Sequence, residues 1–367
     1  MQRTCAIVGD GLAGFVAYAT LRHGGVEPGE IAVFGADPDP VSAWRPRAEA
    51  IRQRHMRSES DGHCYPRSFP GLAPREAVRR RTVEPLLRTV CNRYRPTVAE
   101  FFRHVEEHRD RCRWDESFRW RRAARVRAVR GGLEVDEHGR FQHVLVATGH
   151  PGLAVPPELE GDALAVHAYE PHDYADRVAV VGAGMAAATE GLNALDAGAE
   201  VVSVRRREPA RRPLNVPRPL FSKAALAGFH ATGRTDRAEL LARLGEPSYT
   251  PGREWDEPLE QARREGRFRV SAAVDGQAQV ICATGFRRGF EHDPLLRRLV
   301  EEHELETEGR WIVLGADGTV HALSDGERTL ALSGVHAQWA YPAADTLVGM
   351  KYVARRFLRR VQACRTR

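Results

Sequence analysis

A glycine-rich turn between an apolar strand and a helix occurs twice in this sequence, and it constrains the fold more than any other feature. The first copy is Gly9-Asp10-Gly11-Leu12-Ala13-Gly14, and the second is Gly182-Ala183-Gly184-Met185-Ala186-Ala187. Each leads into a helix-like stretch and then into another apolar strand, at 31–34 and 200–205. The first Gly permits a tight turn, the second lets the backbone approach a pyrophosphate, and the third (or Ala) allows close helix–strand packing. The duplication predicts two βαβ dinucleotide-binding units.

A second repeated element strengthens this interpretation. Val144–Gly149 and Val280–Gly285 are both apolar strands that end in Ala-Thr-Gly, and each lies downstream of one glycine turn. We expect each strand to close the sheet of its own unit, with Thr148, Gly149, Thr284 and Gly285 near the cofactors. Between the first turn and its Ala-Thr-Gly, alternating segments at 125–129, 132–136 and 141–146 predict a small β-meander.

With these two repeats the sequence resembles the two-dinucleotide-binding-domain flavoproteins. Within them it is similar to the flavin-containing and related class B monooxygenases, including the N-hydroxylating ones. The resemblance implies an α/β fold with two Rossmann-like domains, in which the first glycine turn binds FAD and the second binds NADPH. The FAD domain is then 1–155 and 273–367, split by an inserted NADPH domain at 156–272 that carries a Pro-rich excursion at 208–267.

Several local segments extend the resemblance. Ser42-Ala43-Trp44 matches the family's Gly-Gly-x-Trp segment, and 56–66 resembles the stretch that passes the isoalloxazine ring. Leu159-Glu160-Gly161 with a later His167 is a loosened form of another family motif, and 333–338 resembles the segment that closes on the flavin. The cofactor-binding residues that these matches imply are Trp44, Met56, Arg57, Ser58, Gly334 and Gln338. Arg57 and Ser58 are also the catalytic candidates, and Ser60, His167 and Arg218 are further donor candidates near the flavin or the nicotinamide.

One departure concerns the adenosine ribose. The family places an acidic residue at the end of the second strand to hold the ribose hydroxyls, but here Val33-Phe34 is followed by Gly35. Asp37, two residues on, is the candidate replacement. At the corresponding place in the second unit, Arg205-Arg206-Arg207 follows the strand. Arginine there favours the 2′-phosphate of NADPH over NADH.

The composition of the chain offers another explanation for the arginines at 205–207. Only Lys223 and Lys351 are lysines among 55 basic residues, so arginine at any one place can be background. The net charge is +6, and we interpret basic runs such as 79–81 as solvated faces rather than a nucleic-acid site. No apolar run approaches the roughly 20 residues of a membrane span. We expect a soluble, cytoplasmic chain without a metal site or a nucleic-acid or membrane partner.

FAD beside NADPH implies hydride transfer to the flavin, and the remaining question is the electron acceptor. The six cysteines are scattered singly, without the paired spacing of a disulfide reductase. Elimination and resemblance together favour O2, with one oxygen passed through a flavin C4a-(hydro)peroxide to nitrogen or sulfur of a small soluble substrate. Two alternatives stay open: an NADPH-dependent reductase that serves a quinone or a protein, and a flavin-binding protein without turnover.

The excursion at 208–267 departs most from a plain nucleotide-binding domain. It begins Pro-rich and continues with helical stretches at 235–244 and 257–264. A segment of this length favours a lid or substrate loop, with a surface elaboration as the alternative. Phe221 and Trp255 are candidates either to pack a substrate or to pack the excursion on its domain.

Overall fold

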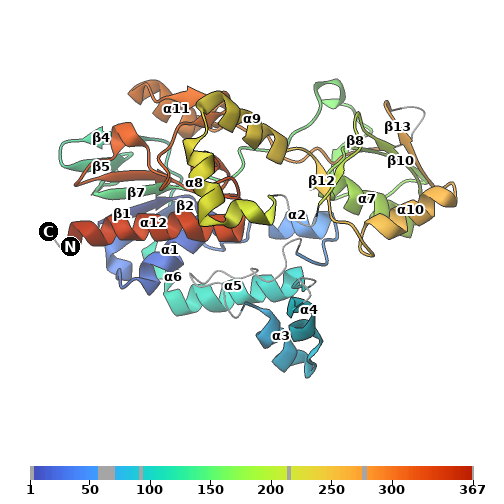
Figure 1. Cartoon of the computed structure of the whole chain (residues 1–367), viewed down its shortest axis with the longest axis horizontal. Coiled ribbons are helices and arrows are strands. Elements are labelled where there is room, and N and C mark those ends of the chain that lie inside the picture. Colours follow the sequence, from blue (N-terminus) through green and yellow to red (C-terminus); the bar gives the residue numbers. More distant parts are fainter. Residues whose placement is uncertain (1–3, 57–70, 91–93, 213–215, 275–278, 366–367) are drawn as a thin grey trace.

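The computed structural model describes residues 4–56, 71–90, 94–212, 216–274 and 279–365, and two units stand out in it (Figure 1). The core of the first unit is a five-stranded parallel sheet in the order β17-β7-β1-β2-β3. These strands are β1 (Cys5–Val8), β2 (Ile31–Gly35), β3 (Phe118–Trp120), β7 (His143–Val146) and β17 (Thr329–Leu332). Strands β1, β2, β7 and β17 are buried along their whole length, as apolar strands covered on both faces should be.

The second unit repeats this arrangement with a parallel sheet in the order β13-β10-β9-β14-β8. Its strands are β8 (Ala165–His167), β9 (Arg177–Val181), β10 (Glu200–Val204), β13 (Phe268–Ser271) and β14 (Gln279–Cys282). The two strands that end in Ala-Thr-Gly lie where the sequence predicts them, because β7 pairs with β1 and β14 pairs with β9. The predicted α/β class with two Rossmann-like units is confirmed.

Helices cover both sheets. The helices of the first unit are α1 (Leu12–His23), α2 (Arg45–Ala50), α3 (Ala73–Arg80), α4 (Glu84–Val90), α5 (Val98–Cys112), α6 (Trp114–Ser117), α11 (Pro294–His303) and α12 (Leu347–Arg365), of which α3 and α4 pack on each other away from the sheet (Figure 1). Helix α1 is buried without interruption from Ala13 to Leu21, because it packs along the long α12 and also contacts β1, α5 and α6. In the second unit, α7 (Met185–Asp196) follows the second glycine turn, and α10 (Asp256–Arg264) packs beside it.

The remaining elements are short. The predicted meander forms an antiparallel sheet of β4 (Val126–Val129), β5 (Gly132–Val135) and β6 (Arg140–Phe141). Its last predicted strand is divided, since 143–146 leaves the meander and joins the parallel sheet as β7. The other pairs are β11 (Ala210–Arg211) with β12 (Ser248–Tyr249), and β15 (Thr307–Glu308) with β16 (Trp311–Ile312). Short 3-10 helices are η1 (Pro28–Glu30), η2 (Pro157–Leu159), η3 (Arg218–Phe221), η4 (Phe290–His292), η5 (His321–Leu323) and η6 (Gly334–Ala337).

The excursion divides between the two units. Helices α8 (Lys223–Ala231) and α9 (Arg234–Leu244) lie over the first unit (Figure 1), where Leu226, Phe229 and Leu241 enter its core. The guanidinium of Arg237 stacks on the Trp339 ring at 5.0 Å. By contrast, Trp255 is buried in the second core and donates from Nε1 to Thr189 Oγ1 (3.0 Å). The excursion therefore contacts both units.

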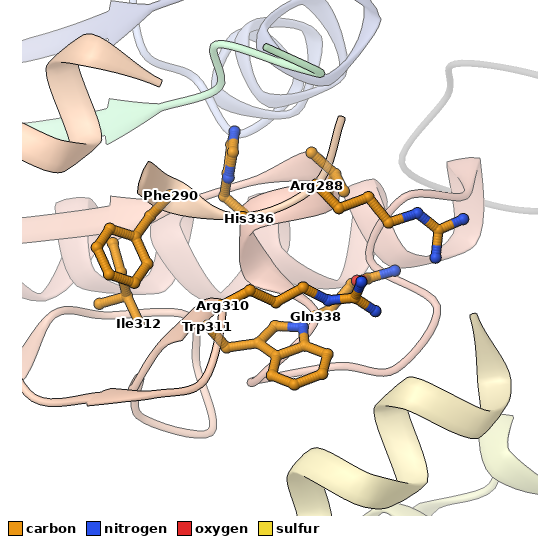
Figure 2. A pocket seen from close by; sticks show the side chains of 9 residues that line it. Arg288, Phe290, Arg310, Trp311, Ile312, His336 and Gln338 are labelled. Atoms are coloured by element: carbon orange, nitrogen blue, oxygen red, sulfur yellow. The ribbon is translucent and has the colours of Figure 1, made fainter. Parts of the chain in front are cut away.

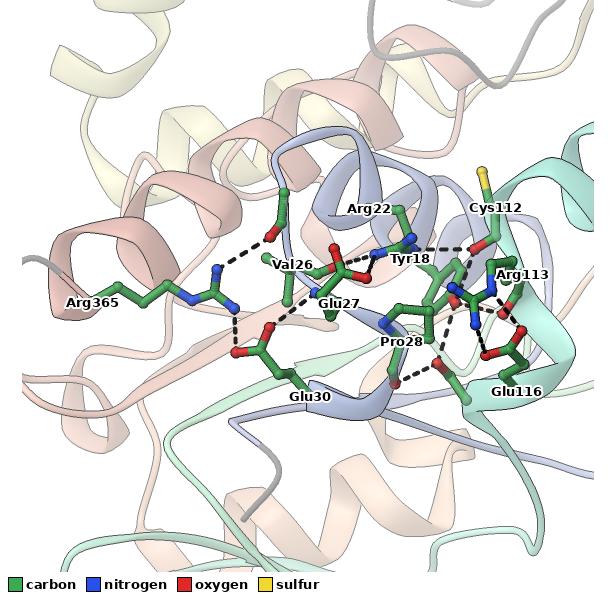
Figure 3. A network of polar contacts seen from close by, with 12 residues as sticks. Tyr18, Arg22, Val26, Glu27, Pro28, Glu30, Cys112, Arg113, Glu116 and Arg365 are labelled. Atoms are coloured by element: carbon green, nitrogen blue, oxygen red, sulfur yellow. Dashed lines mark hydrogen bonds and ion pairs between the residues drawn. The ribbon is translucent and has the colours of Figure 1, made fainter. Parts of the chain in front are cut away.

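Polar contacts fasten the edge of the first unit far from the glycine turn (Figure 3). The hydroxyl of buried Tyr18 donates to the carbonyl of Arg113 (2.8 Å), which joins α1 to the start of α6. Arg365, the last residue of α12, forms an ion pair with Glu30 of η1. These contacts join segments from both ends of the sequence. Within the described residues, no helix is both long and apolar enough to cross a membrane.

Candidate functional site

The first glycine turn has the geometry of a phosphate cradle. Gly9 has a φ of +121°, and a Cβ there would lie less than 3.0 Å from the carbonyl carbon and oxygen of Ala147. Gly14 is packed as tightly against the carbonyl oxygen of Gly9, so α1 can approach the sheet only at glycine. Gly11 differs, since a Cβ there would meet nothing within 4 Å, and it caps α1 without a side-chain hydrogen bond. The turn thus presents open backbone at a helix N-terminus, where anions bind.

The second turn repeats these roles. Gly182 has a φ of +140°, and a Cβ there would lie less than 3.0 Å from the carbonyl of Ala283. Gly184 faces open space and caps α7, which begins at Met185. Ala187, buried in the second core, takes the place of the third glycine. In both units the first glycine packs on the alanine of its own Ala-Thr-Gly strand, and this contact sets the position of the cradle.

The two threonines of these strands make different contacts. Thr148 donates from Oγ1 to Asp293 Oδ2 (2.5 Å), while Thr284 donates to the carbonyl of Ala154. Asp293 also accepts the N–H groups of Leu295 and Leu296 at the start of α11. His336 donates from Nε2 to the carbonyl of Gly149 (2.7 Å) and lies 3.7 Å from Asp293 Oδ2. Burial lowers the pKa of His336 despite this nearby carboxylate.

An aromatic stack lies where the chain passes between the units. The Phe286 ring is stacked with His150 (centroids 4.4 Å apart) and with Tyr169 (5.1 Å). The Arg47 guanidinium of α2 lies 5.0 Å from the same ring. Since His150 and Phe286 directly follow the two Ala-Thr-Gly strands, the stack holds both crossovers together. Through Arg47, the stack also contacts α2 of the first unit.

His167, a sequence candidate for the nicotinamide side, is bound to backbone at both ring nitrogens. Its Nδ1 accepts the N–H of Tyr169 (3.1 Å), so its Nε2 carries the proton and donates to the carbonyl of Gly285 (3.1 Å). Burial lowers the pKa of His167 and favours this neutral form. The structure therefore gives His167 a clear role in holding the second crossover.

A small hollow of about 20 Å³ lies beside η6 and the hairpin of β15 and β16 (Figure 2). Arg288, Arg310, His336 and Gln338 line it together with apolar neighbours. Figure 2 shows the two guanidinium groups pointing to the same side. Burial, and next the charge of Arg288, lower the pKa of Arg310. Arg288 also donates to the carbonyl of Gly245 just after α9 (3.2 Å), so the excursion reaches the rim of this hollow.

The other sequence candidates have varied surroundings. Trp44 packs against Phe101 and Phe102 of α5 and donates to Gln53 Oε1 (3.3 Å). Leu12 and Ala13 pack into the first core at the start of α1, and Ala13 lies next to Gly334. Met56 is buried. Arg57, Ser58 and Ser60 lie outside the described residues, and the side chain of Arg218 is not described, so their predicted roles stay predictions.

The end of β2 differs from the pattern of the family that the sequence resembles. Asp10, between the first two glycines, accepts the N–H groups of Ala36 (2.6 Å) and Asp37 (2.9 Å) at its Oδ2. A Cβ at Gly35 would lie less than 3.0 Å from the Cβ, Cγ and Oδ2 of Asp10. Asp37, the sequence candidate, uses its Oδ1 to accept the N–H of Asp39 (2.8 Å) in a local turn.

The three arginines after β10 are not equivalent. Arg205 is only 10% exposed and donates to both carboxylate oxygens of Glu208 (2.9 and 2.8 Å). Arg206 and Arg207 are 89% and 87% exposed, with ion-pair distances of 3.7 and 3.9 Å. Of the two cofactor candidates, Arg206 therefore has the more exposed guanidinium, and Arg205 must share its charge with Glu208.

Sequence reasoning missed three residues near the first cradle: Asp293, Arg288 and Arg310. Each lies over 100 residues from the first glycine turn, and no spacing rule connects them to it. Asp293 alone had a local signal, since Asp-Pro before an apolar run is typical of a helix start.

Comparisons with known proteins agree with this architecture. No family model matches the sequence, and no curated protein matches it. Among solved structures, the ornithine N-hydroxylase of Kutzneria sp. 744, in a form with reduced FAD, NADP+ and L-ornithine, matches with a TM-score of 0.74 at 15% identity over 99% of both chains. A variant flavin monooxygenase from Stenotrophomonas maltophilia matches with a TM-score of 0.62 at 20% identity over 99% of both chains. Bacillithiol disulfide reductase from Bacillus cereus matches with a TM-score of 0.59 at 15% identity over all of both chains.

The chain thus has the fold of the two-dinucleotide-binding-domain flavoproteins. Its structural neighbours include class B flavin monooxygenases, among them ornithine hydroxylases, matched over nearly the full length of both chains. The resemblance noted in the sequence is confirmed at the level of the fold.

Proposed function

We propose that the chain is an FAD- and NADPH-dependent monooxygenase that transfers one oxygen atom of O2 to nitrogen or sulfur of a small substrate. The observation that carries the proposal is the presence of two complete phosphate cradles, one on each parallel sheet, in a chain matched end to end by flavin monooxygenases. The balanced reaction consumes substrate, O2, NADPH and H+, and yields the oxygenated substrate, NADP+ and water.

The residues present fit the two cofactors. Gly11 and Gly184 leave open space at the N-termini of α1 and α7, as a pyrophosphate requires. Gly9–Gly14 and η6 would hold FAD, and Gly182–Ala187 with Arg206 would hold NADPH. When bound, the pair supplies hydride transfer and the activation of O2. The protein's part is to bind and orient them and to exclude water from the site.

Specific residues support that part. Asp293 and His336 fix the Ala-Thr-Gly crossover beside the first cradle, and His167 fixes the second crossover. Arg288 and Arg310 both line the hollow beside η6. Their two positive charges favour an anionic group at its opening.

A reductase is the second candidate, because bacillithiol disulfide reductase shares the fold over its full length. Product stoichiometry separates the two activities. We expect one NADPH and one O2 to be consumed per oxygenated product when the purified protein is supplied with amine, thioether and ketone libraries under 18O2. Reduction of the flavin by NADPH, with hydrogen peroxide as the only oxygen product for every substrate, would overturn the monooxygenase proposal.

The NADPH assignment has its own test. Arg206→Ala should raise KM for NADPH about tenfold or more, while KM for NADH changes little, because a charge-assisted hydrogen bond to the 2′-phosphate is lost. Arg205→Ala should have a smaller effect, since Glu208 already neutralises that guanidinium. Arg207→Ala is the matched control, being equally exposed and one residue further on. Equal KM ratios in all three variants would show that none of these arginines binds the phosphate.

A further inference from the structure

We propose that Asp10 has taken over the binding of the adenosine ribose of FAD, and that Gly35 is glycine in order to make room for it. This inference rests on the proposed FAD site and goes beyond it, because it assigns the ribose to the residue between the first two glycines. An acid at the end of β2 would ordinarily do this.

The first argument is one of space. All three heavy atoms nearest to a Cβ built at Gly35 belong to the Asp10 side chain, and all lie closer than 3.0 Å. A side chain at 35 and the carboxylate of Asp10 therefore exclude each other. Gly35 has no positive φ that would otherwise require glycine. The absence of an acid at the end of β2 and the presence of Asp10 in the turn are therefore linked, because only one of the two side chains fits.

The second argument is the orientation of the carboxylate. Oδ2 of Asp10 accepts two backbone N–H groups, from Ala36 and Asp37, so the side chain is held on the β2 side of the turn. A carboxylate has about four acceptor positions in all, so two such bonds leave it able to accept hydroxyl groups. Ribose 2′- and 3′-hydroxyls are donors of the type that an ionised, fixed carboxylate binds.

The second unit provides an internal comparison. Its middle residue is Ala183, which has no carboxylate, and its strand β10 is followed by Arg205. The unit proposed to bind a ribose with free hydroxyls therefore carries an acid at this place. The unit proposed to bind a 2′-phosphate carries a cation. Asp37 is the alternative candidate, and its Oδ1 accepts the N–H of Asp39 in a local turn.

The test uses the full-length apoprotein and measures dissociation constants by quenching of flavin fluorescence. The ligands are FAD, its analogue with 2′-deoxyadenosine, and FMN, which has no adenosine. Wild type should bind FAD about 10- to 100-fold more tightly than the deoxy analogue, as expected for hydrogen bonds to a charged group. Asp10→Ala should weaken FAD by a similar factor and should then bind FAD and the deoxy analogue alike.

Two further variants complete the design. Asp37→Ala, the matched control, should leave the preference for FAD within about twofold of wild type, since one hydrogen bond more or less would change it about tenfold. Asp10→Ala combined with Gly35→Glu should restore most of the preference by returning the acid to the end of β2. Gly35→Glu alone should bind FAD poorly because the two side chains collide.

The outcomes separate the possible failures. If Asp10→Ala weakens FAD and the deoxy analogue by the same factor, Asp10 only holds the loop at 36–37, and the inference is overturned. If Asp37→Ala abolishes the preference instead, the acid is Asp37. If folded wild-type protein binds no FAD at all, the proposed function fails together with the inference. If the protein binds FAD but forms no oxygenated product, the proposed monooxygenase activity is overturned and the inference about Asp10 is not affected.

Discussion

At the scale of single residues, the glycines of one turn have opposite physical roles. Gly9 must be glycine because of a positive φ and a backbone contact closer than 3.0 Å, whereas Gly11 has ordinary extended geometry and open space. The fold requires the first glycine, and the second leaves room for the ligand proposed above. The same contrast holds for Gly182 and Gly184.

This contrast predicts that stability and cofactor binding can be separated. Gly9→Ala should lower the Tm of the apoprotein, because the turn must open to admit a Cβ. Gly11→Ala should leave that Tm nearly unchanged but weaken FAD binding about tenfold or more, since a methyl group then blocks the pyrophosphate from the helix N-terminus. Thermal unfolding of the apoprotein and FAD titration measure the two effects. Equal losses of Tm in the two variants would contradict the assignment.

His143 gives a residue-scale effect of pH. It is fully buried in β7, and burial followed by the charge of Arg365 lowers its pKa to about 4. Neither ring nitrogen has a hydrogen-bond partner among the described residues. An unfolded histidine titrates near 6.5, so the unfolded state binds the proton first as the pH falls. Stability is therefore fully present above pH 6.5 and is lost progressively towards pH 4.

His143→Leu should remove this contribution. The free energy of unfolding, measured with urea between pH 7 and pH 4, should fall less steeply in the variant than in wild type. The slope from one such histidine is up to about 1.4 kcal/mol per pH unit. His150, whose pKa burial also lowers to about 4, keeps part of the slope in both proteins. An unchanged slope would mean that His143 is protonated equally in the folded and unfolded states.

At the scale of elements, Asp293 connects a helix start with the first crossover. It caps α11 through two N–H groups and accepts the Thr148 hydroxyl. Thr97 is a cap of the simpler kind, since among the described residues its Oγ1 accepts the N–H of Glu100 in α5 and makes no tertiary hydrogen bond. Comparing the two residues isolates what the tertiary contact adds to the cap.

Asp293→Ala should therefore cost more than Thr97→Ala. A lost cap alone costs about 1 kcal/mol, and losing the hydrogen bond from the half-buried Thr148 hydroxyl adds about 0.5–1.5 kcal/mol. Midpoints of urea unfolding for the two variants provide the comparison. Similar midpoints for both would show that the contact with Thr148 contributes nothing to stability.

Elements that local spacing governs were predictable from the sequence. The glycine turns, the Ala-Thr-Gly strands, the meander, and the excursion helices α9 and α10 lie within a few residues of their predicted ranges, whereas α8 was not predicted. The packing of α8 and α9 on the first core was not predictable, because the local sequence does not say which of the two cores an apolar helix face contacts. The exchange between Asp10 and Gly35 was also hidden, since only tertiary contact shows that one side chain fills the space of the other. The domain boundaries and the roles of Arg57 and Ser58 remain predictions.

At the scale of the whole molecule, the two units are joined at more than one place. The two crossovers lie side by side, with the N–H of Ala154 bonded to the carbonyl of Gly285 (3.0 Å) and that of Arg287 to the carbonyl of Gly152 (2.9 Å). The excursion crosses back to the first unit independently of them. The two crossovers alone would allow the units to move as if about a hinge. The contact of the excursion with the first unit restrains that motion.

The stack around Phe286 should therefore couple the unfolding of the two units. Phe286→Ala removes two aromatic contacts, which contribute about 0.5–1.5 kcal/mol each, and we expect calorimetry to show a lower and broader transition. Trp120→Ala is the control, since that ring is 70% exposed on the first unit. A single transition as sharp as that of wild type would show that other contacts couple the units.

The placement of β17 and α12 has a consequence for synthesis on the ribosome. Strand β17, which pairs with β7 at the edge of the first sheet, and helix α12, which covers α1, are both translated after the whole second unit. The second unit has all its strands between 165 and 282, so it can fold while the first is still missing its last pieces. For that period, the apolar surface of α1 and the open edge of β7 are exposed to water. Chaperones that bind nascent chains should therefore associate with the first unit, and slow translation of the last forty residues should increase aggregation.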